Sequence, residues 1–289
     1  MKISIFGAGN VGSSVALQAI CLGIVNEICL IDILKDFTFG KSLDLSQSAA
    51  IFDKDIKIYG SDDCSLIKNS DVCIITAGAT RKADQSREDL IKINSKIVAE
   101  ISKKIAKFSP NSLILVVTNP LDEMVFVAQK FSNFDKKRVF GMAGELDNAR
   151  FKFYLSEFLN TKFSQTKTAV CGTHNENLVC LNSNLNFKIS QNDLENINLK
   201  TIKGGAKIVE LTKTSAYYAP ASGVCKILKS IKTNEPVFVT AFDGDLPVGK
   251  MAILNKFGIK EFINLDLDEK EKEKLNFGLE KLRKNIEIL

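Results

Sequence analysis

The first half of the chain alternates short apolar runs with longer segments whose apolar residues recur at helical spacing. Strands are expected over residues 3–6, 28–31, 56–59, 72–76, 113–117 and 139–140. Helices are expected over 11–22, 43–52 and 88–108, the last with apolar positions 90, 93, 97, 98, 101 and 105. Regular alternation of strand and helix predicts a parallel sheet that helices cover on both faces.

The pattern changes after the segment Gly141-Met142-Ala143-Gly144, which we interpret as a hinge. A helix over 145–159 precedes a strand at 168–171, an Asn-rich polar stretch over 182–198, and helical segments that Pro220 interrupts. Strand-like runs at 237–241 and 259–265 then lead to a charged helix from Glu269. The second half is therefore expected to be a separate α+β domain, with the boundary between residues 142 and 143.

Composition narrows the class of protein. With 45% hydrophobic and 25% charged residues, the chain is typical of a globular protein, and its longest apolar runs have strand length. Gly7, Gly9 and Asn10 interrupt the apolar start, so we expect no signal peptide, no membrane partner and a cytoplasmic location. The net charge of +5 is mild, acidic and basic residues are interspersed, and the short basic blocks lack interleaved aromatic residues, which argues against a nucleic-acid partner. Seven cysteines form no CxxC pair, so we expect reduced thiols and no metal site.

A glycine-rich turn follows the first strand and opens the first helix. Such a GxGxxG turn lets backbone approach a pyrophosphate at a helix N-terminus, although a tight turn without a ligand has the same residues. This context predicts a dinucleotide-binding (Rossmann) domain over 1–142 and a substrate (catalytic) domain over 143–289. The fold class is then α/β, a doubly wound parallel sheet with a second α+β domain. The turn consists of Gly7, Ala8, Gly9, Asn10, Val11 and Gly12.

Asp32 ends the second expected strand, twenty residues after Gly12. A carboxylate here accepts hydrogen bonds from ribose hydroxyls and repels a 2′-phosphate, so it favours NAD over NADP. A solvated aspartate at a strand end is the alternative interpretation, and the nearby Lys35 leaves open a small activity with NADP.

His174 is the only histidine in the chain, and it follows a strand of the second half. Imidazole is well suited to move a proton near neutral pH, but a lone histidine also serves structural roles. Asp147 and Arg150 share one face of a predicted helix, either as an intrahelical ion pair or as partners of His174 and of a substrate carboxylate. The basic loop from Arg81 to Arg87 follows the fourth strand, where it can bind an anion or simply be solvated.

Several ordered motifs together resemble the lactate/malate dehydrogenase family along nearly the whole chain, and within it the malate enzymes. They are GAGNVG at 7–12, Asp32, Ala77-Gly78-Ala79-Thr80-Arg81 through Arg87, Val117-Thr118-Asn119-Pro120, GMAGELDNARF at 141–151, His174, and Thr214-Ser215-Ala216-Tyr217-Tyr218-Ala219-Pro220.

The resemblance implies reversible NAD-dependent oxidation of (S)-malate to oxaloacetate, with His174 as the proton acceptor and donor. Asp147 would orient its ring, Arg150 would bind the C1 carboxylate, and Arg87 would polarise the carbonyl oxygen. Asn119 would contact both substrate and cofactor. The remaining implied cofactor contacts are Asn94, Val117 and Thr118.

Arg81 is the residue that the resemblance links to substrate choice, because lactate enzymes carry Gln at that loop position. A second carboxylate needs a cation, so Arg81 favours a small dicarboxylate substrate, malate or oxaloacetate. A lactate-type or relaxed 2-hydroxy acid dehydrogenase and a non-enzymatic NAD-binding protein remain alternatives. The family also implies a homodimer or homotetramer.

Three departures from the family pattern are visible. His174-Asn175-Glu176 stands where His-Gly-Asp is usual, and Ala83-Asp84 where Pro-Gly is common. Gly249-Lys250-Met251 replaces Gly-Val-Pro, and the second half looks shortened around 182–200 and 243–249. These changes bear on turnover and subunit contacts more than on the class of reaction.

Overall fold

The structure, a computed structural model, describes residues 1–79 and 87–289, and the side chain of Arg87 lies outside that description. Its centre is a nine-stranded sheet with the order β11-β10-β9-β6-β5-β4-β1-β2-β3, and β7 pairs with β8 in a small second sheet. The strands are β1 (Lys2–Phe6), β2 (Glu27–Ile31), β3 (Lys57–Ser61), β4 (Val72–Ile75), β5 (Leu113–Val116), β6 (Val139–Gly141), β7 (Val170–Cys171), β8 (Val179–Cys180), β9 (Val237–Asp243), β10 (Leu246–Asn255) and β11 (Gly258–Ile263).

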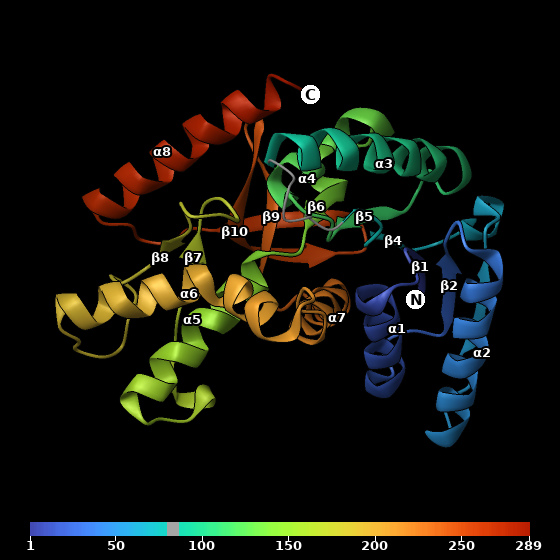
Figure 1. The fold of residues 1–289 in the computed structure, drawn as a ribbon, viewed down its shortest axis with the longest axis horizontal. Coiled ribbons are helices and arrows are strands. Elements are labelled where there is room, and N and C mark those ends of the chain that lie inside the picture. The colour runs from blue at the N-terminus through green and yellow to red at the C-terminus, as the bar shows by residue number, and fades with distance from the viewer. Residues whose placement is uncertain (80–86) are drawn as a thin grey trace.

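The six strands of the first half pair in parallel, which is the doubly wound arrangement that the strand–helix alternation predicts. Helices cover both faces of this sheet (Figure 1). The helices are α1 (Asn10–Leu22), α2 (Lys35–Ile51), α3 (Arg87–Phe108), α4 (Leu121–Ser132), α5 (Gly144–Leu159), α6 (Gln191–Thr212), α7 (Tyr218–Thr233) and α8 (Glu269–Ile286). Three short 3-10 helices are η1 (Cys64–Ile67), η2 (Lys136–Arg138) and η3 (Phe163–Gln165).

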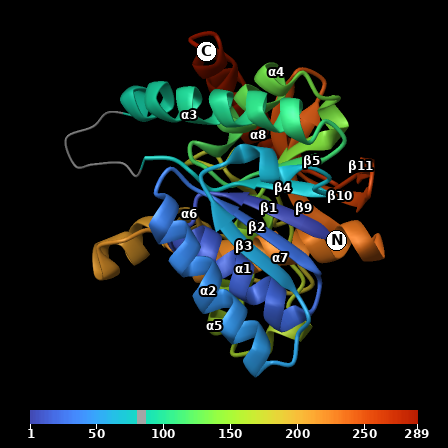
Figure 2. The same cartoon turned by 90° about the vertical axis from the view of Figure 1, so that its right-hand side faces the viewer.

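Alternate residues of each central strand point to opposite faces, so the sheet contributes to two cores. Ile3 and Ile5 of β1 pack in the core under α1, α2 and α7, whereas Phe6 packs in the core under α3 and α4. Figure 2 shows β1, β2 and β3 between α3 on one side and α1 and α2 on the other. A third core joins α5 and α6 to the small sheet of β7 and β8. The predicted fold class is confirmed.

The main sheet does not stop at the last parallel strand. Phe140 and Gly141 of β6 pair antiparallel with Ala241 and Thr240 of β9, so the strands of the second half extend the first-half sheet. Met142 and Ala143, which connect β6 to α5, are both buried. The boundary at 142/143 therefore divides the chain at a packed connection, and the division into two domains stays a prediction.

Several elements differ from those expected, and α4 and β8 were not predicted at all. α2 begins at Lys35 rather than at residue 43. Its first turns carry exposed Phe37 and Phe39 and show no amphipathic pattern, so helical spacing did not predict them. α6 begins inside the Asn-rich stretch, where Ser190 caps it by accepting a hydrogen bond from the backbone of Asp193. β10, the central strand of the antiparallel part, was not predicted either.

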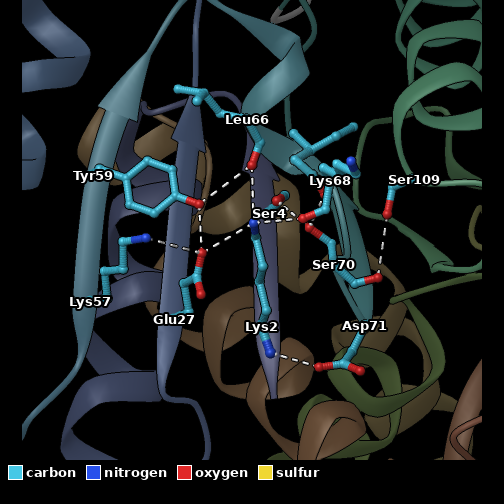
Figure 3. Close-up of polar contacts among 11 residues, drawn as sticks. Lys2, Ser4, Glu27, Lys57, Tyr59, Leu66, Lys68, Ser70, Asp71 and Ser109 are labelled. Carbon is cyan, nitrogen blue, oxygen red and sulfur yellow. Dashed lines mark hydrogen bonds and ion pairs between the residues drawn. The ribbon is translucent and has the colours of Figure 1, made fainter.

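A polar network ties the amino ends of β1, β2 and β3 together, at the opposite end of the sheet from the glycine turn (Figure 3). Glu27 lies 3.1 Å from Nζ of Lys2 and accepts a hydrogen bond of 2.7 Å from the hydroxyl of Tyr59. Lys2 also donates to the carbonyls of Leu66 and Lys68, and so fixes η1 against the sheet. We interpret this network as structural.

Candidate active site

The glycine turn joins β1 to α1 as expected. Gly7 has φ of 104°, and a Cβ on Gly12 would lie 1.9 Å from the carbonyl oxygen of Gly7, so α1 starts this close to the turn only because Gly12 has no side chain. By contrast, a Cβ on Gly9 would have no described atom within 4 Å. The N-terminus of α1 thus faces open space, as a pyrophosphate would require.

Asp32 lies beside this turn. Its two carboxylate oxygens accept hydrogen bonds from the backbone N–H of Ala8 at 2.8 Å and of Leu34 at 3.2 Å. The hydroxyl of Ser13, which the sequence did not single out, donates to the carbonyl of Ala8 at 2.8 Å. The carboxylate is therefore held at the edge of the turn, where ribose hydroxyls are expected.

The loops after β4 and β5 are joined by Asn94 of α3, which is 1% exposed. Its Oδ1 accepts from the backbone N–H of Ala79 at 2.8 Å, and its Nδ2 donates to the carbonyl of Asn119 at 2.6 Å. Thr118 donates to the carbonyl of Ala77 at 2.7 Å, and Val117 packs at the border of the core under α1. Asn94 therefore positions both loops through their backbones, and its direct contact with the cofactor stays a prediction.

His174 meets Asp147 and Arg150 at one cavity, although His174 is far from both in sequence. Asp147, 3% exposed, places one oxygen 2.7 Å from Nδ1 of His174 and the other 3.5 Å from Nη1 of Arg150. The cavity has a volume of about 290 Å³, and Asn119 also lines it. The remaining lining residues are Leu146, Asn175, Leu178, Ile202, Gly205, Val209, Ser215, Ala216 and Pro220.

The charge around His174 favours its protonated form. Burial of the imidazole lowers its pKa, but the charge and hydrogen bond of Asp147, together with the charge of Asp122, outweigh burial and raise the net pKa above its usual value. Arg150 opposes this effect only in part. The arrangement suits a group that holds a proton near neutral pH and releases it during a reaction.

The loop that carries His174 is fixed on both sides. Before it, Gly172 forms two backbone hydrogen bonds with Gly249 of β10, at 3.1 and 2.7 Å. After it, the side-chain oxygen of Asn175 accepts from the hydroxyl of Thr173 and from the backbone N–H of Asn177. Asn175 therefore stabilises a tight turn behind the histidine, so this departure from the family pattern is structurally accommodated.

The basic loop lies largely outside the described residues. Arg81, Ala83 and Asp84 fall in the segment that the structure leaves out, and Arg87 is placed only as the first residue of α3. Their predicted roles rest on the sequence alone.

Among the described residues, three or more His, Cys, Asp or Glu side chains nowhere gather as a metal site would require. All seven cysteines are free. In the same part of the chain, every helix is too short or too polar to cross a membrane.

The sequence analysis did not identify two residues near the cavity. Asp122 accepts a hydrogen bond from the backbone of His174, and Gly205 approaches the guanidinium of Arg150. The only signal was the position of Asp122 three residues after Asn119; nothing in the sequence pointed to Gly205.

Both halves of the chain match models of one protein family. Residues 1–141 match the NAD-binding domain of lactate/malate dehydrogenase, and residues 144–289 match the α/β C-terminal domain of the same family. The chain is 39% identical over 293 residues to a probable malate dehydrogenase from Campylobacter jejuni, covering 96% of this chain and 97% of that protein.

Solved structures of both branches of the family superpose on the chain. A malate dehydrogenase from Cryptosporidium parvum, 32% identical, has a TM-score of 0.95 and covers 100% of this chain and 98% of its own. A lactate dehydrogenase from the same organism, complexed with lactic acid and NAD, is 27% identical with a TM-score of 0.95, covering 99% and 97%. The chain therefore belongs to the lactate/malate dehydrogenase family, and it is an NAD-dependent oxidoreductase.

Proposed function

We propose that the chain is a malate dehydrogenase, which converts (S)-malate and NAD reversibly to oxaloacetate and NADH. The convergence of His174, Asp147 and Arg150 on one cavity with Asn119 carries this proposal. The identity of 39% to a probable malate dehydrogenase supports the choice of substrate. When bound, the nicotinamide accepts or supplies the hydride.

We assign to His174 the role of exchanging the proton with the substrate. Asp147 accepts a hydrogen bond from Nδ1, so Nε2 is the ring atom left to take the hydroxyl proton of malate and to return it to the carbonyl oxygen of oxaloacetate. Asp147 positions the imidazole and stabilises its charge in the step that protonates it.

The substrate carboxylates are assigned to arginines. Arg150 lines the cavity and is 17% exposed, so its guanidinium is available to pair with the C1 carboxylate. Arg87 would stabilise the charge that develops on the carbonyl oxygen, and Arg81 would bind the second carboxylate. Asn119 would hydrogen-bond to the substrate as well as to the cofactor.

The cofactor is assigned to the carboxyl ends of the parallel strands. The open N-terminus of α1, Asp32 at the end of β2, and the loop after β5 fit a dinucleotide lying across this edge. The assigned residues are Gly7, Ala8, Gly9, Asn10, Val11, Gly12, Asp32, Asn94, Val117, Thr118 and Asn119.

A lactate-type dehydrogenase is the second candidate, because a lactate enzyme superposes as well as a malate enzyme does. The substrates of the two candidates differ by one carboxylate, which oxaloacetate has and pyruvate lacks. Pyruvate would leave Arg81 without a partner in a closed site, which costs on the order of 10² to 10⁴ in specificity.

One assay separates these candidates. NADH oxidation is measured with oxaloacetate and with pyruvate, for the wild type and for Arg81→Gln. We expect rapid turnover with oxaloacetate only, and a shift toward pyruvate in the variant. Equal or better use of pyruvate by the wild type would support the lactate type instead, and tight NADH binding without turnover of either acid would support a non-enzymatic NAD-binding protein.

The chain is further proposed to form a homodimer or homotetramer. Large apolar side chains are exposed over the start of α2 and the residues before it, which is the kind of surface that subunit contacts bury. They are Ile33, Leu34, Phe37, Phe39 and Leu43. Light scattering after size-exclusion chromatography tests this proposal, and a monomer at micromolar concentration would contradict it.

A further inference from the structure

Asp122 is a buried carboxyl for which the proposed reaction has no assigned role. It is the second residue of α4, three residues after Asn119, and its relative exposure is 1%. Burying a carboxyl costs free energy unless hydrogen bonds or charges compensate for it. Its surroundings therefore indicate what the residue does.

The two oxygens of Asp122 face two other segments of the chain. Oδ2 accepts a hydrogen bond of 2.7 Å from the backbone N–H of His174, and Oδ1 lies 3.5 Å from the hydroxyl of Thr240 on β9. Helix α4, the histidine loop and the antiparallel part of the sheet thus meet at one side chain. Only Pro120 separates Asn119 from the start of α4. The hydrogen bond between Asp122 and the backbone of His174 therefore also constrains the distance between Asn119 and His174.

The charges around this contact act on one another. His174 faces Asp147 and Arg150 from α5 and Asp122 from α4. Burial and the charge of the neighbouring Glu123 together raise the pKa of Asp122 to about 7, although the charge of His174 opposes both effects. Two groups that interact in this way titrate as a pair, so the charge of one depends on the proton of the other.

An acidic residue in the first turn of a helix is often explained by the helix dipole alone. Here the carboxylate instead accepts from a backbone N–H that is 52 residues away in sequence. Glu123, which is also buried in this turn, accepts a hydrogen bond of 2.8 Å from the side-chain amide of Asn285 on α8.

We propose that Asp122 is a positioning residue for proton transfer: its carboxylate fixes the backbone of His174 relative to Asn119, and its negative charge stabilises the imidazolium. The inference rests on the proposed function for its effect on turnover. Its effect on His174 is independent of turnover, because any proton on the imidazole interacts with the same charge.

The test uses two variants and a matched control. Asp122→Asn keeps an oxygen that can accept from the backbone of His174 but removes the charge, whereas Asp122→Ala removes both. The control is Glu271→Gln, because Glu271 is also buried and accepts a backbone N–H at 2.7 Å, but that N–H belongs to Asn182. All three variants are expected to change the melting temperature, and only the first two are expected to affect His174.

The first readout is the titration of His174 followed by NMR in the full-length protein without a histidine tag. Because the chain has one histidine, its imidazole signal needs no assignment among several. We expect the midpoint of this titration to move to lower pH in Asp122→Asn and to stay in place in Glu271→Gln. This readout remains available if the wild type fails to reduce oxaloacetate, so failure of the proposed function is distinguished from failure of this inference.

The second readout is steady-state kinetics with oxaloacetate. Asp122→Ala is expected to lower kcat about 10²-fold with NADH binding retained, because a misplaced catalytic group loses its alignment with the substrate. For Asp122→Asn, the pH at which reduction declines is expected to fall together with the NMR midpoint. Either an unchanged midpoint in Asp122→Asn or an unchanged kcat in Asp122→Ala overturns the proposal and leaves Asp122 a purely structural residue.

Discussion

A Cβ atom on Gly205 would lie 3.1 Å from Nη2 of Arg150, a contact so tight that the guanidinium would have to shift to admit a side chain at this position of α6. Gly204, one residue earlier, packs in the same way against the methylene groups of Arg150. The two glycines thus set where the guanidinium sits in the cavity, and through Asp147 they are connected to the histidine.

Gly205→Ala is expected to raise the KM for oxaloacetate about 10-fold, equivalent to about 1.4 kcal/mol, because the new methyl group displaces the guanidinium. The same change favours a helix by about 0.5–1 kcal/mol, so the melting temperature should not fall. Gly40→Ala is the control, since a Cβ on Gly40 in α2 meets no described atom within 4 Å. That control should gain stability without a change in KM, and an unchanged KM in Gly205→Ala would refute the role of this glycine.

His174→Asn removes the group that exchanges the proton. The kcat for oxaloacetate reduction is expected to fall at least about 10²-fold, the usual contribution of a positioned acid or base. NADH binding, measured by fluorescence titration, should persist because the glycine turn and Asp32 are unchanged. Retained turnover would mean that the proton comes from another group.

The pH dependence follows from the raised pKa of His174. Reduction of oxaloacetate needs the protonated imidazole, so kcat/KM for reduction should decline as pH rises through a midpoint above about 6.5, the ordinary value. Oxidation of malate needs the neutral imidazole, so its kcat/KM should increase through the same midpoint. Profiles measured in both directions check this, and profiles that move in the same direction would contradict the assignment.

Asp32→Asn tests the preference for NAD. The amide keeps an oxygen that can accept from the backbone N–H of Ala8, but it removes the charge that repels a 2′-phosphate. The ratio of kcat/KM for NADH to that for NADPH is expected to fall, mainly through a lower KM for NADPH. Asp36→Asn, on the exposed first turn of α2, is the control and should leave the ratio unchanged.

Periodicity was sufficient to predict the strands of the parallel half and most of its helices, but it missed α4 and the first turns of α2. Its strands are buried on both faces and are punctuated by glycine turns and helices, so strands and crossovers follow from local pattern. The antiparallel half was harder to predict. Gly249 and Lys250 interrupt the apolar pattern of β10, and they do so because Gly249 must pair with Gly172 at a distance that admits no side chain. That requirement comes from a segment far away in the chain.

The candidate site was predicted to the extent that its motifs are local. The glycine turn, Asp32, and the pair of Asp147 and Arg150 were found by spacing, and the structure places the last two with His174. Asp122 was not found, because its partner is 52 residues away and an acid near a helix start has an ordinary local explanation.

The pairing of β6 with β9 has a consequence for dissection of the molecule. In an isolated fragment ending at residue 141, Phe140 and Gly141 would lose their pairing with β9, and their backbone N–H and C=O groups would lie unpaired on an exposed strand edge. Such a fragment is expected to self-associate through that edge. The intact chain should melt in one cooperative step, because the two halves share one continuous sheet through the pairing of β6 with β9.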